Sequence, residues 1–290
     1  GTPFVRGMLE DTRPKNFSEL VRISGFSHGT DVWLNNAQDL IKNGVVKLED
    51  AISTRDDVMN YLIQHGVKPL TSFKVMENVR KGKGLEKGGS NNRAELDAAH
   101  VPQWFIDSCL KIGYLFPRAH AVAYVMMAFR IAWFKVHEPL AFYATFFSIR
   151  AKAFDAEYCC AGMDAVKQKI REIENNKDAT DVEQNLLVTL EVCYEFYLRG
   201  FHFDTISIYD SDATHFKITE NGLLPPFVTV RGLGETAALD TVEKRKGKTF
   251  ISVEEFATIC NKLSKTHIEQ LKALGAFAGM ADTSQVTLFW

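Results

Sequence analysis

Residues 228–238 read VTVRGLGETAA, and this stretch decides how the C-terminal part of the chain folds. The glycines of Gly232-Leu233-Gly234 predict a tight turn between a short helix and a second helix that begins at Glu235. Such a turn points backbone N–H groups outward at a helix N-terminus, a geometry that binds phosphate. Basic residues around the turn attract a sugar-phosphate backbone without reading its bases. The candidate DNA-binding residues here are Arg231, Gly232, Leu233, Gly234, Lys244 and Arg245.

A second stretch, residues 263–277, has the composition of a matching hairpin. Its sequence LSKTHIEQL at 263–271, followed by Leu274-Gly275-Ala276-Phe277, resembles the degenerate partner in a helix-hairpin-helix pair. Two alternatives stay open. The first glycine turn can simply join two core helices, or it can bind a dinucleotide. The dinucleotide alternative is the weaker one, because no strand-helix-strand unit with a downstream acidic residue surrounds the turn.

Outward from these hairpins, helical periodicity dominates the first two hundred residues. Short amphipathic stretches begin near Asn16, Ala37, Asp56 and Thr71, and longer ones cover 119–137, 164–173 and 182–198. Between Arg80 and Ala99 the pattern breaks, and we expect a flexible basic loop there. After Gly200 the residues alternate in short runs, which predicts a few strands. The fold class is therefore mainly α: an irregular helical domain, then a small α+β domain with tandem hairpins.

Composition excludes several classes of protein. Of the 290 residues, 46% are hydrophobic and 24% charged, with 34 Lys and Arg against 36 Asp and Glu, which is typical of folded proteins. The apolar run 119–134 is interrupted by His120 and Arg130 and is shorter than the ~20 residues of a bilayer-spanning helix, so we expect no membrane. No signal segment and no CxxC pair are present, which favours the cytoplasm.

A second candidate site lies at residues 116–124, FPRAHAVAY. Pro117 is suited to a helix entrance, which places Arg118 and His120 near the positive end of that helix, with Tyr124 one turn beyond His120. An arginine fork neutralises a polyphosphate, a histidine donates a hydrogen bond, and a tyrosine ring offers a flat surface to a base or sugar. The alternative is a surface arginine beside a partly buried His and Tyr.

A third stretch, residues 24–33, reads SGFSHGTDVW and is rich in small and polar residues. His28 and Asp31 are candidates for metal ligands or for parts of a hydrolytic triad, but no third group is located, and a capped loop at a helix junction is favoured. Asp56 and Asp57 form a charge pair at a helix start, next to Arg55. Finally, Arg80, Lys81 and Lys83 either follow a nucleic-acid strand or form a solvated charge run.

Together these residues resemble the C-family bacterial replicative DNA polymerases, of the PolC type found in low-GC Gram-positive bacteria. The resemblance runs essentially end to end, and its strongest blocks are residues 4–14, 24–33, 79–85, 116–124, 130–137 and 232–235. It implies a fingers domain at 1–200 and a duplex-DNA-binding domain at 201–280. It also implies a C-terminal tail at 281–290 in which Gln285, Leu288 and Phe289 bind a sliding clamp.

The same resemblance implies a division of labour. It places the incoming dNTP near Ser27, His28, Arg55, Arg118, His120 and Tyr124. It assigns no catalytic residue and no metal ligand to this chain, because the two-metal carboxylates and their Mg²⁺ belong to a palm domain that precedes Gly1. We therefore expect a chain that is inactive alone. The expected partners are primer-template DNA, dNTP, the sliding clamp and the rest of the polymerase chain.

The sequence departs from the family pattern at two places, and two other classes of function remain as alternatives. Residues 88–92 replace a more acidic connection, and Trp290 follows the clamp-like motif. A non-enzymatic helix-hairpin-helix module that binds DNA is the alternative function. An independent nucleotide-hydrolysing enzyme that uses His28 and Asp31 is a third.

Overall fold

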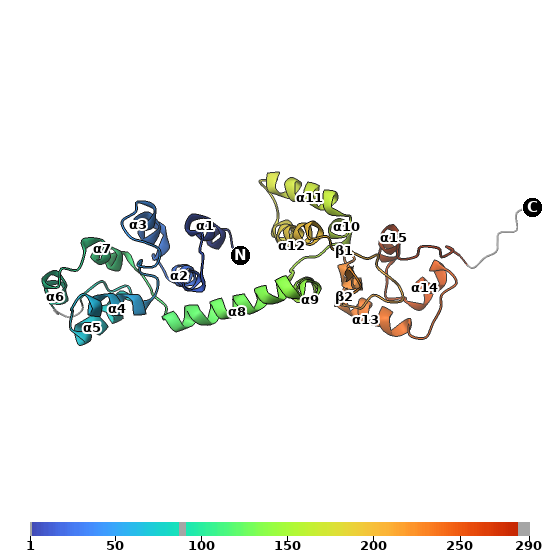
Figure 1. The fold of residues 1–290 in the computed structure, drawn as a ribbon. Coiled ribbons are helices and arrows are strands. Elements are labelled where there is room, and N and C mark those ends of the chain that lie inside the picture. Colours follow the sequence, from blue (N-terminus) through green and yellow to red (C-terminus); the bar gives the residue numbers. More distant parts are fainter. Residues whose placement is uncertain (1, 87–90, 284–290) are drawn as a thin grey trace, which may run out of the picture. The chain divides into compact units, whose positions relative to one another are not determined.

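The computed structural model describes residues 2–86 and 91–283, and the packing divides the chain into two compact units, 1–131 and 132–290 (Figure 1). The first unit is an irregular assembly of short helices. They are α1 (Pro3–Thr12), α2 (Phe17–His28), the wide turn η1 (Trp33–Ala37), α3 (Gln38–Lys42), α4 (Arg55–Gln64), α5 (Pro69–Val79), α6 (Asn92–Ala98), α7 (Gln103–Lys111) and most of α8 (Arg118–His137).

Local sequence explains where these helices begin. The Asn16 side chain accepts a hydrogen bond from the Glu19 N–H at 3.0 Å and caps α2. Pro69 stands in the first turn of α5, where its missing N–H costs nothing. Thr54 and Asp57 form a reciprocal capping box at the start of α4. Most predicted helices of this unit are therefore confirmed within a residue or two.

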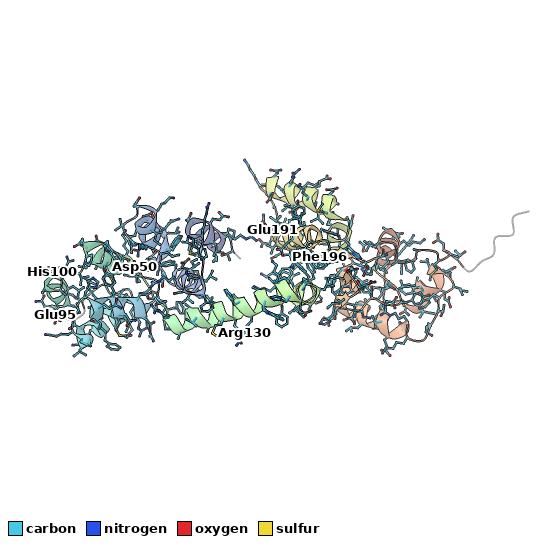
Figure 2. All side chains as sticks on the ribbon, viewed as in Figure 1. Asp50, Glu95, His100, Arg130, Glu191 and Phe196 are labelled. Carbon is cyan, nitrogen blue, oxygen red and sulfur yellow. The ribbon has the colours of Figure 1, made fainter. Side chains whose placement is uncertain are left out.

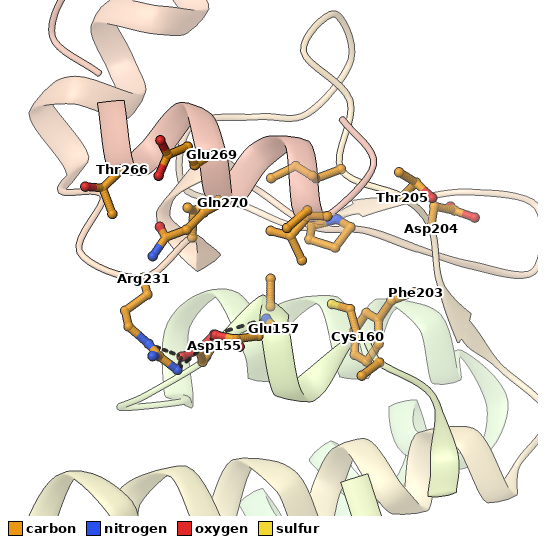
Figure 3. Close-up of a pocket in the computed structure, with 17 residues that line it drawn as sticks. Asp155, Glu157, Cys160, Phe203, Asp204, Thr205, Arg231, Thr266, Glu269 and Gln270 are labelled. Atoms are coloured by element: carbon orange, nitrogen blue, oxygen red, sulfur yellow. Dashed lines mark hydrogen bonds and ion pairs between the residues drawn. The ribbon is translucent and has the colours of Figure 1, made fainter. Parts of the chain in front are cut away.

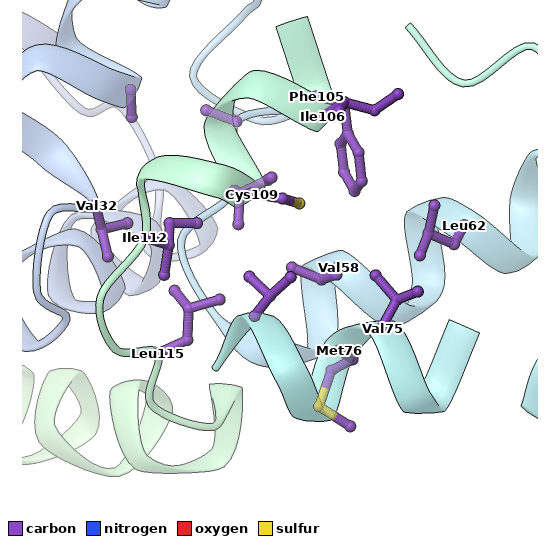
Figure 4. Close-up of a cluster of buried hydrophobic side chains, with 14 of the residues drawn as sticks. Val32, Val58, Leu62, Val75, Met76, Phe105, Ile106, Cys109, Ile112 and Leu115 are labelled. Atoms are coloured by element: carbon purple, nitrogen blue, oxygen red, sulfur yellow. The ribbon is translucent and has the colours of Figure 1, made fainter. Parts of the chain in front are cut away.

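One apolar core holds the first unit together. Val58 and Leu62 of α4, Val75 of α5, and Phe105 and Cys109 of α7 are all fully buried in it (Figure 4). Each large side chain buried in this way contributes about 1.5–3 kcal/mol of transfer free energy. The packing fixes the start of α4 and, through α7, the segment 112–117 that leads into α8.

The structure differs from the sequence-based predictions at two places in this unit. The stretch 80–99, predicted to be a loop, contains α6; residues 87–90 of the expected flexible segment lie outside the described residues. The apolar stripe of α8 is not buried as its periodicity suggested. Ala121 and Val125 are the buried residues of α8, and Arg130 projects from it into solvent (Figure 2).

The second unit combines helices with a small sheet. Its elements after α8 are α9 (Pro139–Thr145), the wide turn η2 (Phe146–Arg150), α10 (Ala156–Cys159), α11 (Met163–Asn175), α12 (Asp181–Leu198), β1 (His202–Phe203), β2 (Lys217–Ile218), β3 (Gly222–Leu224), the 3₁₀ turn η3 (Phe227–Thr229), α13 (Glu235–Lys244), α14 (Val253–Ile259) and α15 (Lys265–Ala273). The strand order is β1-β3-β2, with β1 parallel and β2 antiparallel to β3. The predicted mainly helical fold with a small α+β part is confirmed.

Two cores stabilise this unit. Aromatic rings fill the first, where Phe196 of α12 packs among Tyr143, Phe147 and Phe203. The second core lies under the hairpins and is built on Phe227, Leu233, Phe256, Leu271 and others. Because the hairpins share this second core, their turns are fixed relative to one another.

The length and composition of α8 are relevant to whether the chain crosses a membrane. Within the described residues, α8 is the one helix long and apolar enough to cross a membrane by length and composition. A single such helix is weak evidence for a span, and His120 and Arg130 interrupt its apolar sequence.

Candidate functional site

The first hairpin has the geometry that the glycines predicted. Gly232 adopts a φ of +76°, which an L side chain rarely tolerates, and the Leu233 N–H donates to the Val230 carbonyl at 3.0 Å to close the turn. Leu233 then enters the core. Gly234 caps α13 with no side-chain hydrogen bond, so the first N–H groups of α13 are left for solvent or a ligand.

The second hairpin, α14–turn–α15, begins its second helix differently. Ser264 Oγ accepts from the His267 N–H, and His267 Nδ1 accepts from the Ser264 N–H, both at 3.2 Å. A Cβ built on Gly232 would lie 3.7 Å from His267 Nε2, so the two turns are neighbours. The cap of α15 therefore satisfies the His267 N–H, while α13 has no side-chain cap at its N-terminus. The first hairpin is therefore the one whose helix N-terminus no side chain of its own cap covers.

The basic residues after the first hairpin have internal partners. Lys244 donates to Asn261 Oδ1 at 2.6 Å and pairs with Asp240 at 3.0 Å, which ties α13 to the second hairpin. Arg245 is buried, donates to the carbonyls of Ile208 and Ser211, and lies over the Phe227 ring. The Arg245 guanidinium is therefore occupied inside the fold.

In the first unit, four of the predicted nucleotide-side features gather around one aromatic group. The His28 ring lies 5.0 Å from both His120 and Tyr124, measured between ring centroids, and His120 stacks on Phe116 at 4.7 Å. Ser27 Oγ lies 3.2 Å from His28 Nδ1. Tyr124 is 56% exposed, so one face of this group is open to a ligand.

Backbone contacts fix the protonation pattern of His28. Its Nδ1 lies 2.6 Å from the Ser24 carbonyl oxygen, which can only accept a hydrogen bond. Nδ1 therefore carries a proton, and Nε2 is the acceptor of the neutral ring. A ligand that meets Nε2 of the neutral ring must bring a donor.

Arg118 lies away from this aromatic group, because side chains two positions apart on a helix, such as Arg118 and His120, point to nearly opposite sides. Its guanidinium pairs with Asp57, and its backbone N–H donates to Asp56 Oδ2 at 2.6 Å. The Arg55 N–H donates to the Phe116 carbonyl at 3.0 Å and joins the starts of α4 and α8. The chain's own Asp56 and Asp57 thus neutralise part of the positive charge at the start of α8.

Asp57, which the sequence indicated only as part of a charge pair, is a functional candidate in the structure. It also pairs with Arg22 at 3.4 Å and accepts hydrogen bonds from the backbone and hydroxyl groups of Ser53 and Thr54 at 2.7–3.0 Å. Burial opposes its charge, but Arg22, Ser53, Arg118 and Thr54 outweigh burial and lower the pKa of Asp57. The spacing Thr54-x-x-Asp57 is a capping-box signal that could have found it.

Close packing beside Asp57 depends on Gly25. A Cβ on Gly25 would lie 2.6 Å from the Ser53 carbonyl oxygen, so α2 can approach this segment only with glycine at that position. This approach lets Arg22, one turn earlier on α2, reach both Asp57 and the Ala51 carbonyl, the latter at 2.7 Å.

The basic residues at 80–83 are also partly neutralised. Arg80 pairs with Glu77 through two hydrogen bonds of 2.5 and 2.8 Å, and Lys81 lies 3.1 Å from the same carboxylate. The hydrogen bond from Arg80 is the main reason that the pKa of Glu77 falls to about 2. Lys83 is exposed.

Two remaining expectations concern metal ions and the clamp motif. Across residues 2–86 and 91–283, no group of three His, Cys, Asp or Glu side chains is placed to hold a metal ion, and Asp31 sits in a left-handed turn with a φ of +55°. Gln285, Leu288 and Phe289, the predicted clamp-binding residues, lie outside the described residues.

Comparison with known families agrees with this arrangement. Residues 1–99 match the bacterial DNA polymerase III alpha subunit finger domain, and residues 200–286 match a helix-hairpin-helix motif. The class of protein is therefore one in which a bacterial DNA polymerase III finger domain precedes a helix-hairpin-helix motif. The predicted division near residue 200 is compatible with these matches and remains a prediction, since the compact units divide at 131.

Individual relatives narrow the class. The full chain is 51% identical to the PolC-type DNA polymerase III of Caldanaerobacter subterraneus, 50% to that of Thermotoga maritima over 289 residues, and 49% to that of Clostridium perfringens. These matches span 100% of this chain and 20–21% of the length of each relative. The chain belongs to the PolC-type DNA polymerase III family, and it spans about a fifth of the length of these relatives.

Proposed function

We propose that this chain serves a DNA-directed DNA polymerase by gripping the primer-template duplex and by facing the incoming dNTP. The observation that carries the proposal is the open N-terminus of α13, which a glycine turn presents beside a second hairpin. Backbone amides there bind phosphates of any sequence, and a replicative enzyme needs such a sequence-independent grip. The whole assembly works in the bacterial cytoplasm.

On the nucleotide side, the proposal rests on two neighbouring features of the first unit. His28, His120 and Tyr124 form a partly open aromatic surface on which a base or sugar stacks, with Ser27 beside it. The joined starts of α4 and α8 carry one net positive charge, which results from the three arginines and two aspartates there: Arg22, Arg55, Arg118, Asp56 and Asp57. That net charge attracts a triphosphate.

The rest of the polymerase chain supplies what these residues lack. We assign the catalytic carboxylates and Mg²⁺ to that part, as the resemblance to the C-family polymerases implies. The tail residues Gln285, Leu288 and Phe289 dock on the sliding clamp. A weak contact there suffices, because tethering raises the effective concentration of polymerase at the DNA.

The experiment compares Gly234→Asp with Gly234→Asn in duplex binding. Both residues are good N-caps, and nothing lies within 4 Å of a Cβ at this position, so both variants keep the fold. The added carboxylate repels phosphate, and its neutral counterpart does not. We expect Gly234→Asp to bind a fluorescent primer-template duplex at least tenfold more weakly than Gly234→Asn. Equal affinities at fixed salt would refute the hairpin assignment.

A further inference from the structure

Arg231, the basic residue inside the first hairpin turn, does not face solvent alone. Its Nε donates to Asp155 Oδ2 at 2.8 Å, and its Nη2 lies 2.8 Å from Asp155 Oδ2 and 3.2 Å from Glu157 Oε2. The guanidinium also lies over the Tyr158 ring, 5.2 Å from its centroid. Two carboxylates and an aromatic face therefore surround a cation that we expect to bind DNA.

The acidic side of this contact is held rigidly. Asp155 is 16% exposed as a side chain, and its other oxygen accepts from the Glu157 N–H at 3.0 Å to cap α10. Arg231 is 52% exposed and sits on the hairpin turn, 76 residues later in the chain. The carboxylate is therefore in place for an arginine fork, as a phosphate would be.

A cavity of about 550 Å³ lies beside the pair, between α10 and α15 (Figure 3). Asp155, Glu157, Asp204 and Glu269 contribute carboxylates to its lining. Among the lining residues, all within the described part of the chain, Arg231 is the single Lys or Arg. A phosphate is repelled from this side, so DNA can bind the Nε and Nη2 groups of Arg231 only if they leave the carboxylates.

We propose that Asp155 and Glu157 act as phosphate surrogates that mask Arg231 until a duplex phosphate displaces them. The inference rests on the proposed function, because it assumes that the first hairpin binds the DNA backbone. Masking lowers the affinity for DNA in general, since each engagement must break the ion pair. The contact is an autoinhibitory device within the second unit.

The test uses the double variant Asp155→Asn with Glu157→Gln. Asparagine preserves the cap of α10, so the local fold is retained. The matched control is Glu172→Gln with Glu174→Gln, which removes two charges from exposed positions on α11. Duplex affinity is measured over a salt series, with thermal unfolding as a check on folding.

We expect the unmasked variant to bind the duplex about five- to tenfold more tightly than the control at 100 mM salt. One additional phosphate contact makes the slope of log K against log salt more negative by about 0.9. Arg231→Ala in the unmasked background removes both gains, whereas in the original chain it changes affinity by less than about threefold.

The outcomes separate the two ideas. If neither the original nor the unmasked chain binds duplex, both the hairpin function and the masking fail. If the original chain binds duplex but the unmasked variant binds no better than the control, the masking alone is wrong. Weaker binding by the unmasked variant also overturns it, because the ion pair would then be positioning the hairpin for DNA.

Discussion

Replacing the Asp57 carboxylate by an amide, Asp57→Asn, removes the charge that holds Arg22 and Arg118 at the joined starts of α4 and α8. Breaking a buried ion pair costs about 3–5 kcal/mol. Two facts reduce this figure here: the Arg118 side chain is 45% exposed, and Arg22 keeps its hydrogen bond to the Ala51 carbonyl. We therefore expect a loss of about 3 kcal/mol in the free energy of unfolding.

Urea unfolding measures this loss, and the exposed pair between Arg93 and Asp97 supplies the control. Asp97→Asn removes the same charge from side chains that are 40% and 55% exposed, and it should cost less than about 0.5 kcal/mol. If Asp57→Asn costs no more than this control, Asp57 is not the charge that holds Arg22 and Arg118 in place.

The pH dependence of the same difference gives a second check. The pKa of Asp57 is lowered in the folded state, so its contribution is complete above the unfolded pKa of about 3.9 and is lost as the pH falls through the folded value. The difference in free energy of unfolding between the original chain and Asp57→Asn should narrow below about pH 4 and be constant between pH 6 and 8. A gap that widens on acidification contradicts the assignment.

Other predictions concern packing, nucleotide and clamp. Gly25→Ala should destabilise the chain by about 2 kcal/mol in urea unfolding, because its Cβ would lie 2.6 Å from a carbonyl oxygen. The control Gly7→Ala, where the space is open, should not destabilise the chain. Equal stabilities of the two variants would refute the close packing at Gly25. Tyr124→Ala should weaken binding of a fluorescent dNTP about tenfold with no change in duplex affinity, and unchanged dNTP binding would remove the stacking surface from the proposal. Phe289→Ala should abolish capture of the chain by immobilised sliding clamp, and retained capture would exclude the tail motif.

The sequence predicted well what is encoded over a few residues. Periodicity and capping residues located α2, α4, α5, α8, α11 and α12, and the two glycines located the turn before α13. These features depend on hydrogen bonds within one or two helical turns, so the local spacing of side chains determines them. The short strands after residue 200 were anticipated as a class, but their pairing was not.

What the sequence did not predict depends on contacts between distant residues. Arg231 pairs with Asp155, which lies 76 positions earlier in the sequence, and Arg118 pairs with Asp57, 61 positions earlier. No local pattern therefore predicts either ion pair. Arg245 belongs to a basic run, yet it turns inward because carbonyls near residue 210 accept its donors. The expected loop at 80–99 contains α6 because Leu96 is fully buried in the core.

Hydrogen–deuterium exchange of the chain with and without a primer-template duplex tests the central claim most directly. The account predicts slower exchange on DNA binding in residues 230–237, greatest at the Glu235 and Thr236 amides that Gly234 leaves uncapped, and unchanged exchange in α11. Protection confined to residues 80–86, with residues 230–237 unaffected, would contradict it and move the DNA contact to the first unit.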